Sequence, residues 1–400
     1  MPTALVIGGG VAGPVTAMAL QRAGIDATVH EAHPAGADDI GAFLTLQTNG
    51  IAALRAIGAH RCVADHGFPT PRMRFFSGSG KPLGVVPNGG ALSDGTVSHT
   101  LRRADLYRAL RDEALRRGVP IAYGKRLVEA RQAGGRVTAV FADGSEAEGD
   151  LLVGCDGIRS RVRSLIDPAA PPARYVPLLN VGGYARGVDT AAAPGEYAMV
   201  FGRRAFFGYA PAPGGETWWF ANPPCRRDPG PAVADIGDAR WRAWLEDLYA
   251  VDDSPAVDLI RATPGRLRGW TTYDMPSVPR WHAGAMVIVG DAAHAAAPSS
   301  GQGASLAIED AVVLAKCLRD LPSPQEAFAA FEDLRRARVE RIVAAAARTS
   351  DTKVAGPVKR VFRDLLMPWF LKRAAGDGDD SLAWVHRYDV AWDDPVAAAA

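Results

Sequence analysis

The segment ALVIGGGVAG, residues 4–13, joins a short apolar run to a glycine-rich turn. Helical periodicity follows through residues 15–24, and Gly24 is placed to end that helix. IDATVHEA, residues 25–32, has the pattern of a second strand. A strand–turn–helix–strand opening of this kind is a βαβ unit, and it predicts an α/β fold with a parallel, doubly wound sheet.

The glycines of this turn match the G-x-G-x-x-G dinucleotide fingerprint in its required context, after a strand and before a helix. Gly8 permits the tight turn, Gly10 lets the backbone approach a pyrophosphate, and Gly13 allows close packing of helix and strand. Glu31 follows the second strand, 18 residues after Gly13, where a carboxylate accepts hydrogen bonds from an adenosine ribose. We therefore expect nucleotide binding at the positive N-terminus of this helix. The predicted cofactor-binding residues of the segment are Gly8, Gly10, Val11, Ala12, Gly13 and Glu31.

A second motif lies in DLLVGCDGIRSRVRS, residues 150–164, where Asp156-Gly157 ends a buried strand. Taken alone, this motif favours a strand-to-helix turn in which Ser160 or Asp156 caps the helix. Proximity to a bound cofactor is the alternative.

The third motif is GDAAHAAAPSSGQGASLAIED, residues 290–310. Asp291 ends another buried strand and can accept a hydrogen bond from a ribityl hydroxyl. The loop after it opens a helix whose free N–H groups can face a pyrophosphate or a flavin carbonyl. For His294, a hydrogen bond that stabilises the loop is favoured over a catalytic role. The candidate cofactor contacts at this helix start are Gly301, Gly303, Ala304 and Ser305.

In this order and spacing, the three motifs resemble those of the para-hydroxybenzoate hydroxylase family of single-component flavoprotein monooxygenases. That family carries an N-terminal G-x-G-x-x-G, a central D-G and a C-terminal G-D motif. The resemblance extends to HTLRRADLYRAL, residues 99–110, which matches the family's R-x-x-L helix, and to the closing WVHRYDVAWDD. Many members have Asn where this chain has Ser305.

The resemblance implies bound FAD, NADH or NADPH as a transient reductant, and O₂ as the source of one oxygen atom inserted into an aromatic or heteroaromatic substrate. By that match Asp291 binds the ribityl chain, Pro298 lies near the flavin ring, and Asp156 lies near FAD and the nicotinamide. Arg103 reaches the flavin, or Arg102 if the register differs by one. A second G-x-G-x-x-G is absent, which fits transient binding of NAD(P)H.

The amino-acid composition changes at about residue 171, where Pro, Gly and aromatic residues become frequent. Alternation in EYAMVFGRRAFFGYAP and GETWWFAN predicts an antiparallel sheet that forms a substrate pocket against the flavin ring. Tyr209 and Arg204 are the polar candidates for orienting a phenolate. The candidates for lining the pocket, with ordinary core packing as the alternative, are Met199, Phe201, Phe206, Phe207, Tyr209, Trp218 and Trp219.

We therefore expect three parts. Residues 1–70, 99–170 and 280–350 form a Rossmann-type FAD-binding domain, residues 71–98 and 171–279 form an inserted antiparallel-sheet substrate domain, and residues 351–400 form a C-terminal helical segment. Within that last segment, the amphipathic, basic stretch 357–373 favours a helix packed across the domain junction over a membrane-surface helix.

Composition narrows the class of protein. A 48% hydrophobic, 22% charged chain with net charge +1 is ordinary for a globular protein and offers no electrostatic case for nucleic acid. The four cysteines form no C-x-x-C pair and have no histidine at metal-ligand spacing, so no metal site is expected. The N-terminus has the pattern of a strand, and no apolar run reaches the ~18 residues of a membrane span. We expect a cytoplasmic monomer or homodimer.

Other classes remain as alternatives: a flavoprotein oxidoreductase that does not hydroxylate, and an NAD-binding dehydrogenase or regulatory protein. The D-G and G-D motifs disfavour the last two, because a plain dinucleotide-binding fold needs neither. A flavin halogenase is disfavoured because its W-x-W-x-I-P signature is missing. The high content of Ala, Gly, Pro and Arg indicates a GC-rich bacterial genome, which in turn favours a role in natural-product metabolism.

Overall fold

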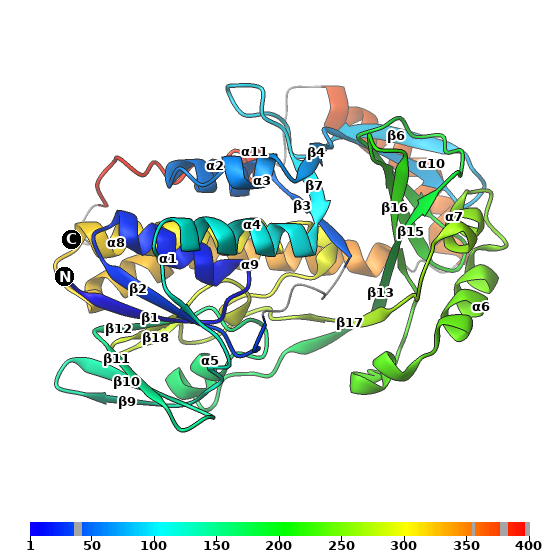
Figure 1. Ribbon diagram of the computed structural model, residues 1–400. Coiled ribbons are helices and arrows are strands. Elements are labelled where there is room, and N and C mark those ends of the chain that lie inside the picture. The colour runs from blue at the N-terminus through cyan, green and yellow to red at the C-terminus, as the bar shows by residue number, and fades with distance from the viewer. Residues whose placement is uncertain (36–41, 354–356, 377–382, 397–400) are drawn as a thin grey trace.

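The computed structural model describes residues 1–35, 42–353, 357–376 and 383–396 of the chain. Two large sheets organise this part of the chain: a parallel one beside the N-terminus and, at the right of Figure 1, a larger and mostly antiparallel one. The predicted α/β fold with a second, mostly antiparallel sheet is confirmed.

The six-stranded sheet contains the βαβ unit predicted from the N-terminal segment. Its strands, in spatial order, are β18 (His282–Ala283), β19 (Met286–Ile288), β12 (Leu151–Gly154), β1 (Thr3–Ile7), β2 (Asp26–His30) and β8 (Ile121–Ala122). All neighbours pair in parallel except β18, the antiparallel edge strand. Parallel strands bring their carboxyl ends to one edge of a sheet, so the three motifs, which follow β1, β12 and β19, lie side by side.

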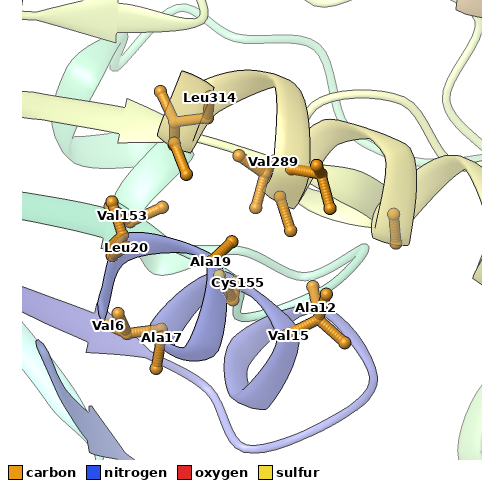
Figure 2. Close-up of a cluster of buried hydrophobic side chains, with 14 of the residues drawn as sticks. Val6, Ala12, Val15, Ala17, Ala19, Leu20, Val153, Cys155, Val289 and Leu314 are labelled. Atoms are coloured by element: carbon orange, nitrogen blue, oxygen red, sulfur yellow. The ribbon is translucent and has the colours of Figure 1, made fainter. Parts of the chain in front are cut away.

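Helices cover both faces of this sheet. Figure 1 shows α1 (Ala12–Arg22), α4 (Arg103–Arg116) and α8 (Gly303–Asp320) on one side, and α5 (Arg161–Ile166) on the other. Figure 2 shows how α1 packs between the strands and α8, through buried side chains such as Val6, Ala19 and Val289. The alanines of α1 let the three layers approach closely, which places the N-termini of α1 and α8 near the same edge.

Two small sheets flank the parallel sheet. β9 (Leu127–Ala133), β10 (Arg136–Phe141) and β11 (Glu146–Gly149) form one, with Asp143-Gly144 in the turn between β10 and β11. The other contains β3 (Phe43–Leu46), β7 (His99–Arg102) and β4 (Gly67–Pro69). Two helices follow β3, namely α2 (Thr48–Ala56) and α3 (Arg61–Ala64), while β7 leads directly into α4. This second small sheet joins the two halves of the fold.

The seven-stranded sheet is built from segments 72–87 and 174–274. In spatial order its strands are β17 (Gly269–Asp274), β13 (Arg174–Arg186), β16 (Glu216–Asn222), β15 (Phe206–Pro211), β14 (Glu196–Phe201), β5 (Arg72–Ser77) and β6 (Pro82–Pro87). The pair β14–β5 is parallel and the others are antiparallel. One face packs against α6 (Asp238–Tyr249) and α7 (Ala256–Ala262). The opposite face, which we call the inner face, is turned toward β3 and β7.

Three helices belong to the C-terminal region. The long α9 (Pro324–Thr352) runs from α8 toward the seven-stranded sheet, α10 (Pro357–Gly376) packs on β6, and the short α11 (Ala383–His386) lies near α2. α10 places Met367 and Leu371 against Leu83 and the neighbouring phenylalanines while exposing Phe362 and Leu365. Of the predicted helical segment 351–400, residues 354–356, 377–382 and 397–400 lie outside the described residues. No helix in the described ranges has both the length and the apolar character to cross a membrane.

Candidate active site

The turn after β1 has the stereochemistry that the fingerprint requires. Gly8 has φ of +109°, and a Cβ on it would lie 2.5 Å from the carbonyl oxygen of Cys155. A Cβ on Gly13 would lie 1.9 Å from the carbonyl oxygen of Gly8. A Cβ on Gly10, by contrast, would meet nothing within 4 Å. Two glycines are therefore required by packing, whereas the third faces open space and fits the approach of a pyrophosphate to the first turn of α1, with Val11 and Ala12.

Glu31 lies beside this turn, directly after β2. Its carboxylate accepts hydrogen bonds from the backbone N–H of Gly9 at 2.6 Å and of His33 at 2.7 Å. Each carboxylate oxygen keeps a further lone pair. The buried carboxylate is thus held by the backbone in an orientation that suits hydrogen bonds from ribose hydroxyls.

Glu31→Ala should weaken FAD binding by about 1–3 kcal/mol, because charge-assisted hydrogen bonds to the ribose are lost. The measurement is titration of the FAD-free protein with FAD, followed by quenching of flavin fluorescence. Glu148→Ala is the control, because Glu148 is an exposed carboxylate on β11 of the same domain. Equal FAD affinity in the Glu31 variant and the native protein would refute the ribose role.

Asp291 follows β19 and lies near the start of α8. An ideal Cβ on Gly303 would be 3.9 Å from Asp291 Oδ1, so this carboxylate borders the first turn of α8. Its side chain is reached by solvent, yet desolvation by the surrounding protein raises the pKa of Asp291, while His294 and Arg103 act in the opposite direction. The structure therefore brings together Asp291 and Arg103, which are far apart in sequence.

Two successive arginines serve different halves of the fold. Arg103, at the start of α4, donates from Nε to the hydroxyl of Tyr107 at 2.8 Å, on the side of Asp291. Arg102, at the end of β7, pairs with Glu216 at 2.8 Å and lies over the ring of Tyr184. This placement favours Arg103, rather than Arg102, as the arginine directed to the cofactor.

The remaining predicted contacts lie at the start of α8. Gly301 has φ of +60°, and Gly303, Ala304 and Ser305 form the first turn, whose N–H groups have no intrahelical acceptor. The Ser305 side chain is fully buried, and its Oγ accepts from the backbone N–H of Gln47 at 3.1 Å. Its side chain therefore links α8 to the residue that precedes α2. Pro298 is exposed in a short 3-10 turn, Pro298–Ser300.

The D-G motif has a capping geometry. Asp156 accepts hydrogen bonds from the backbone N–H of Arg161 at 2.7 Å and Val162 at 3.1 Å, and from Ser160 Oγ at 2.5 Å. It therefore caps α5, as the motif taken alone suggests. Arg163, held in this helix, donates to the carbonyl of Ala292 at 3.0 Å. The second motif thus braces the loop of the third.

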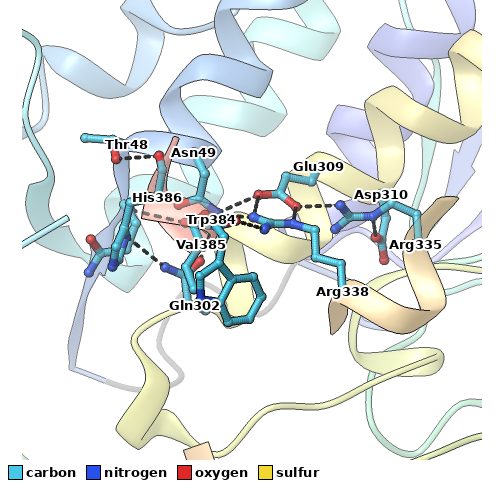
Figure 3. Close-up of polar contacts among 12 residues, drawn as sticks. Thr48, Asn49, Gln302, Glu309, Asp310, Arg335, Arg338, Trp384, Val385 and His386 are labelled. Carbon is cyan, nitrogen blue, oxygen red and sulfur yellow. Dashed lines mark hydrogen bonds and ion pairs between the residues drawn. The ribbon is translucent and has the colours of Figure 1, made fainter. Parts of the chain in front are cut away.

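The loop between β19 and α8, which begins at Gly290-Asp291 and which we call the G-D loop, is supported by a buried ionic network (Figure 3). Arg335 of α9, fully buried, pairs through Nη1 with Glu309 Oε2 at 2.6 Å and through Nε with Asp310 Oδ1 at 2.7 Å. Asp310 also accepts from the backbone N–H of Gly290 at 2.9 Å. Arg338 and Asn49 contact Glu309 as well. Sequence reasoning marked Glu309 and Asp310 but missed Arg335, since only the packing of α9 on α8 brings it there.

His294 belongs to this network. Its Nε2 lies 2.5 Å from Asp310 Oδ2, and the side chain is buried. Burial by itself raises the pKa of Asp310, but His294 and Arg335 together lower it to about 2. This geometry agrees with a loop-stabilising role for His294.

Two predicted substrate contacts need correction. Tyr209 is buried on the face of β15 that packs against α6 and α7, away from the inner face. Arg204 is exposed in the β14–β15 turn, where its Nη1 lies 3.1 Å from Asp247 Oδ2. The period of two in a strand decides the first case, because it turns neighbouring side chains to opposite faces. Neither residue is therefore placed to orient a substrate on the inner face.

The same alternation divides the aromatic candidates. Phe207 and Trp219 stack on each other at the helix-covered face, with Tyr209. Met199, Phe201, Phe206 and Trp218 lie on the inner face, where Trp218 contacts Phe43 of β3 at 5.6 Å between ring centroids. Four of the seven candidates thus lie on the inner face: Trp218 and Met199 cluster with Phe43 of β3, whereas Phe201 and Phe206 cluster with Leu83 of β6 and with side chains of α10.

The G-D loop directly touches the seven-stranded sheet. Ala295 accepts a hydrogen bond from the backbone N–H of Met275 at 2.8 Å, and Ala297 packs with Val176 and Leu178 of β13. Pro298, the next residue, therefore stands where the nucleotide-binding edge meets the aromatic sheet. In one chain, a glycine-rich edge of the nucleotide-binding type therefore abuts an aromatic sheet.

Comparison with known proteins gives the family. The model of the FAD binding domain family matches residues 1–346, and the chain belongs to this family. It is 31% identical over 355 residues to the aurachin C monooxygenase/isomerase of Stigmatella aurantiaca, covering 86% of this chain and 88% of that protein. It is 31% identical over 356 residues to the FAD-dependent urate hydroxylase of Klebsiella pneumoniae, covering 87% and 89%.

Solved structures agree with this assignment. The crystal structure of Klebsiella pneumoniae HpxO complexed with FAD and uric acid superposes with a TM-score of 0.81 at 28% identity, covering 94% of each chain. The protein is therefore an enzyme of the FAD-dependent monooxygenase family, and the family resemblance predicted from its motifs is confirmed.

Proposed function

We propose that the protein hydroxylates an aromatic or heteroaromatic small molecule, using NADH or NADPH to reduce its FAD and O₂ as the oxygen source. The observation that supports this proposal is the contact between the G-D loop and the seven-stranded sheet, where Ala297, the neighbour of Pro298, packs with Val176 and Leu178 of β13. Relatives named as hydroxylases of urate, 3-hydroxybenzoate and 6-hydroxynicotinate support a ring substrate.

The chain supplies binding, orientation and exclusion of water, while bound FAD supplies the redox and oxygen chemistry. In this proposal Glu31 holds the ribose, Gly10 admits the pyrophosphate and Asp291 holds the ribityl chain. The positive N-terminus of α8 stabilises negative charge at the flavin ring. Aromatic side chains of the inner face hold the substrate ring in a dry site.

We place NAD(P)H as a transient partner, because the sequence has one fingerprint and FAD uses it. In this proposal Asp156 affects cofactor binding indirectly. It caps α5, and Arg163 of α5 donates a hydrogen bond to the carbonyl of Ala292, the neighbour of Asp291. The free cysteines of the described chain fit a reducing compartment, and we propose a cytoplasmic monomer or homodimer.

Asp291→Ala should weaken FAD binding by roughly 10-fold to 100-fold, the cost of losing a hydrogen bond to a charged acceptor. The readout is the ratio of flavin to protein absorbance after gel filtration. Asp247→Ala, which removes an exposed carboxylate from α6, is the matched control. A variant that keeps full flavin and full activity would remove Asp291 from the site.

The decisive experiment is anaerobic mixing of the FAD-loaded protein with NADH or NADPH, with and without phenols, hydroxybenzoates, hydroxynicotinates and urate. A productive compound should accelerate loss of the oxidised flavin absorbance. It should then yield, under isotope-labelled O₂, a product that carries one labelled oxygen atom. Reduction without oxygen insertion by any compound would favour a flavoprotein oxidoreductase that does not hydroxylate.

A further inference from the structure

A lysine lies buried at the inner face, beside the aromatic candidates. Lys353 follows the last turn of α9, and 8% of it is exposed. Its Nζ donates to Asn222 Oδ1 of β16 at 2.7 Å. It also lies 4.6 Å from the ring centroid of Phe206 and 5.8 Å from that of Phe220. The ammonium group therefore sits among two aromatic rings and one neutral amide.

No carboxylate compensates this charge in the described part of the chain. Lys353 has no ion-pair partner among those residues, and one hydrogen bond leaves two of its three donors unused. Burial lowers the pKa of Lys353 to about 7. A buried, unpaired ammonium is unfavourable, and lysines are rarely buried without a partner.

The amides beside Lys353 are oriented to accept from it. Asn222 Nδ2 donates to Asn180 Oδ1 at 2.6 Å, and Asn180 Nδ2 donates to Thr272 Oγ1 at 2.6 Å. This chain of hydrogen bonds fixes the direction of both amides across β16, β13 and β17. The carbonyl end of Asn222 is thereby presented to the ammonium group, which holds Nζ at one position on the inner face.

This position is next to the proposed substrate site. Ala346 of α9 packs against Ala297, the neighbour of Pro298, and Lys353 lies two helical turns further on, about 10 Å along the axis. Phe220, which lies beside Lys353, also contacts Phe43 of β3. Asn180, Met199 and Phe220 are partly exposed, so this part of the inner face is accessible.

A purely structural role does not account for a lysine here. Methionine would fill similar space and join the end of α9 to the sheet without the cost of burying a charge. A cation that has no carboxylate partner among the described residues is instead suited to an anion that arrives from outside.

We propose that Lys353 recognises the anionic group of the substrate, and that the substrate is therefore an aromatic acid or another ring compound ionised at neutral pH. Its ionised group pairs with Nζ while its ring lies along Phe220 and Phe206. This inference rests on the proposed function and names the substrate class. It also transfers to Lys353 the orienting role that Arg204 and Tyr209 are too remote to perform.

The test uses matched acids and amides as probes: 3-hydroxybenzoate with 3-hydroxybenzamide, and 6-hydroxynicotinate with 6-hydroxynicotinamide. Their affinities for the FAD-loaded protein are measured by isothermal titration calorimetry. At least one acid should bind about tenfold or more tightly than its amide. Lys353→Met should abolish this preference and Lys353→Arg should retain it. Lys372→Met is the control, since it removes an exposed lysine of α10 and changes net charge equally.

Thermal stability separates recognition from a structural role. Without ligand, Lys353→Met should melt at the same or a higher temperature than the native protein, because an unpaired buried charge is gone. A lower melting temperature, or an acid preference that survives in Lys353→Met, would overturn the proposal, as would the lack of any acid preference in the native protein. Lys353→Gln replaces the methionine variant if that variant does not fold. Failure of the proposed function is distinct: it would appear as a native protein whose flavin NAD(P)H does not reduce.

Discussion

Arg335→Met should lower the free energy of unfolding by about 3–5 kcal/mol, the usual cost of removing one partner from a buried ionic network. Arg335 is fully buried between Glu309 and Asp310, at 2.6 Å and 2.7 Å. Without it, two neighbouring carboxylates share the interior with less compensation. Because Asp310 also holds the backbone N–H of Gly290, the G-D loop should loosen and FAD affinity should fall as well. Urea unfolding of the FAD-free proteins measures the first effect, and FAD titration the second.

The pH dependence identifies the cause of this loss. In the native protein the pKa of Asp310 is lowered to about 2, so its contribution is complete above pH 4 and is lost as pH falls toward 2. In the variant, burial without Arg335 should raise that pKa, so the stability deficit should be larger at pH 8 than at pH 5. Arg116→Met is the control: Arg116 is exposed where it pairs with Glu113, so its loss should cost far less stability than the loss of Arg335. Equal losses in the two variants would mean that the network has no special role.

Gly13→Ala should abolish measurable FAD binding, with affinity reduced by at least about 100-fold, or ~2.7 kcal/mol. A methyl group at this position would lie 1.9 Å from the carbonyl oxygen of Gly8, which is backbone and has no rotamer to change. The start of α1 must therefore move away from β1, and the phosphate-binding turn moves with it. The FAD-free variant should also melt at a lower temperature than the native protein.

Two further glycine variants separate packing from cofactor contact. Gly10→Ala should leave the melting temperature of the FAD-free protein unchanged, since its Cβ meets no atom within 4 Å, but should weaken FAD binding because it occupies the proposed path of the pyrophosphate. Gly214→Ala, in an exposed turn that is equally open, should change neither property. If Gly10→Ala binds FAD normally, the pyrophosphate does not approach this turn as we describe.

The sequence alone was sufficient to predict the fold of the nucleotide-binding half. Glycine positions, strand ends and the acid after β2 are local features, and local sterics specify them: Gly8 needs its positive φ, and Gly13 has no room for a side chain. Their order along the chain also predicted the family. The locations of the three motifs on one edge followed from the parallel pairing that a βαβ unit implies.

Only the tertiary structure showed which polar side chains lie on the inner face of the seven-stranded sheet. It alone also revealed the buried network of Arg335, Glu309 and Asp310 that supports the G-D loop. Tyr209 and Phe206 lie three residues apart on one strand, yet they face opposite sides of the sheet, and the sequence does not say which side α6 and α7 cover. Arg335 lies on α9 and Lys353 directly follows it, in a stretch of ordinary sequence. Both acquire their roles when α9 packs against α8 and then reaches the inner face. Long-range packing sets these burial patterns, and burial is what turns an ordinary arginine or lysine into a strong electrostatic partner.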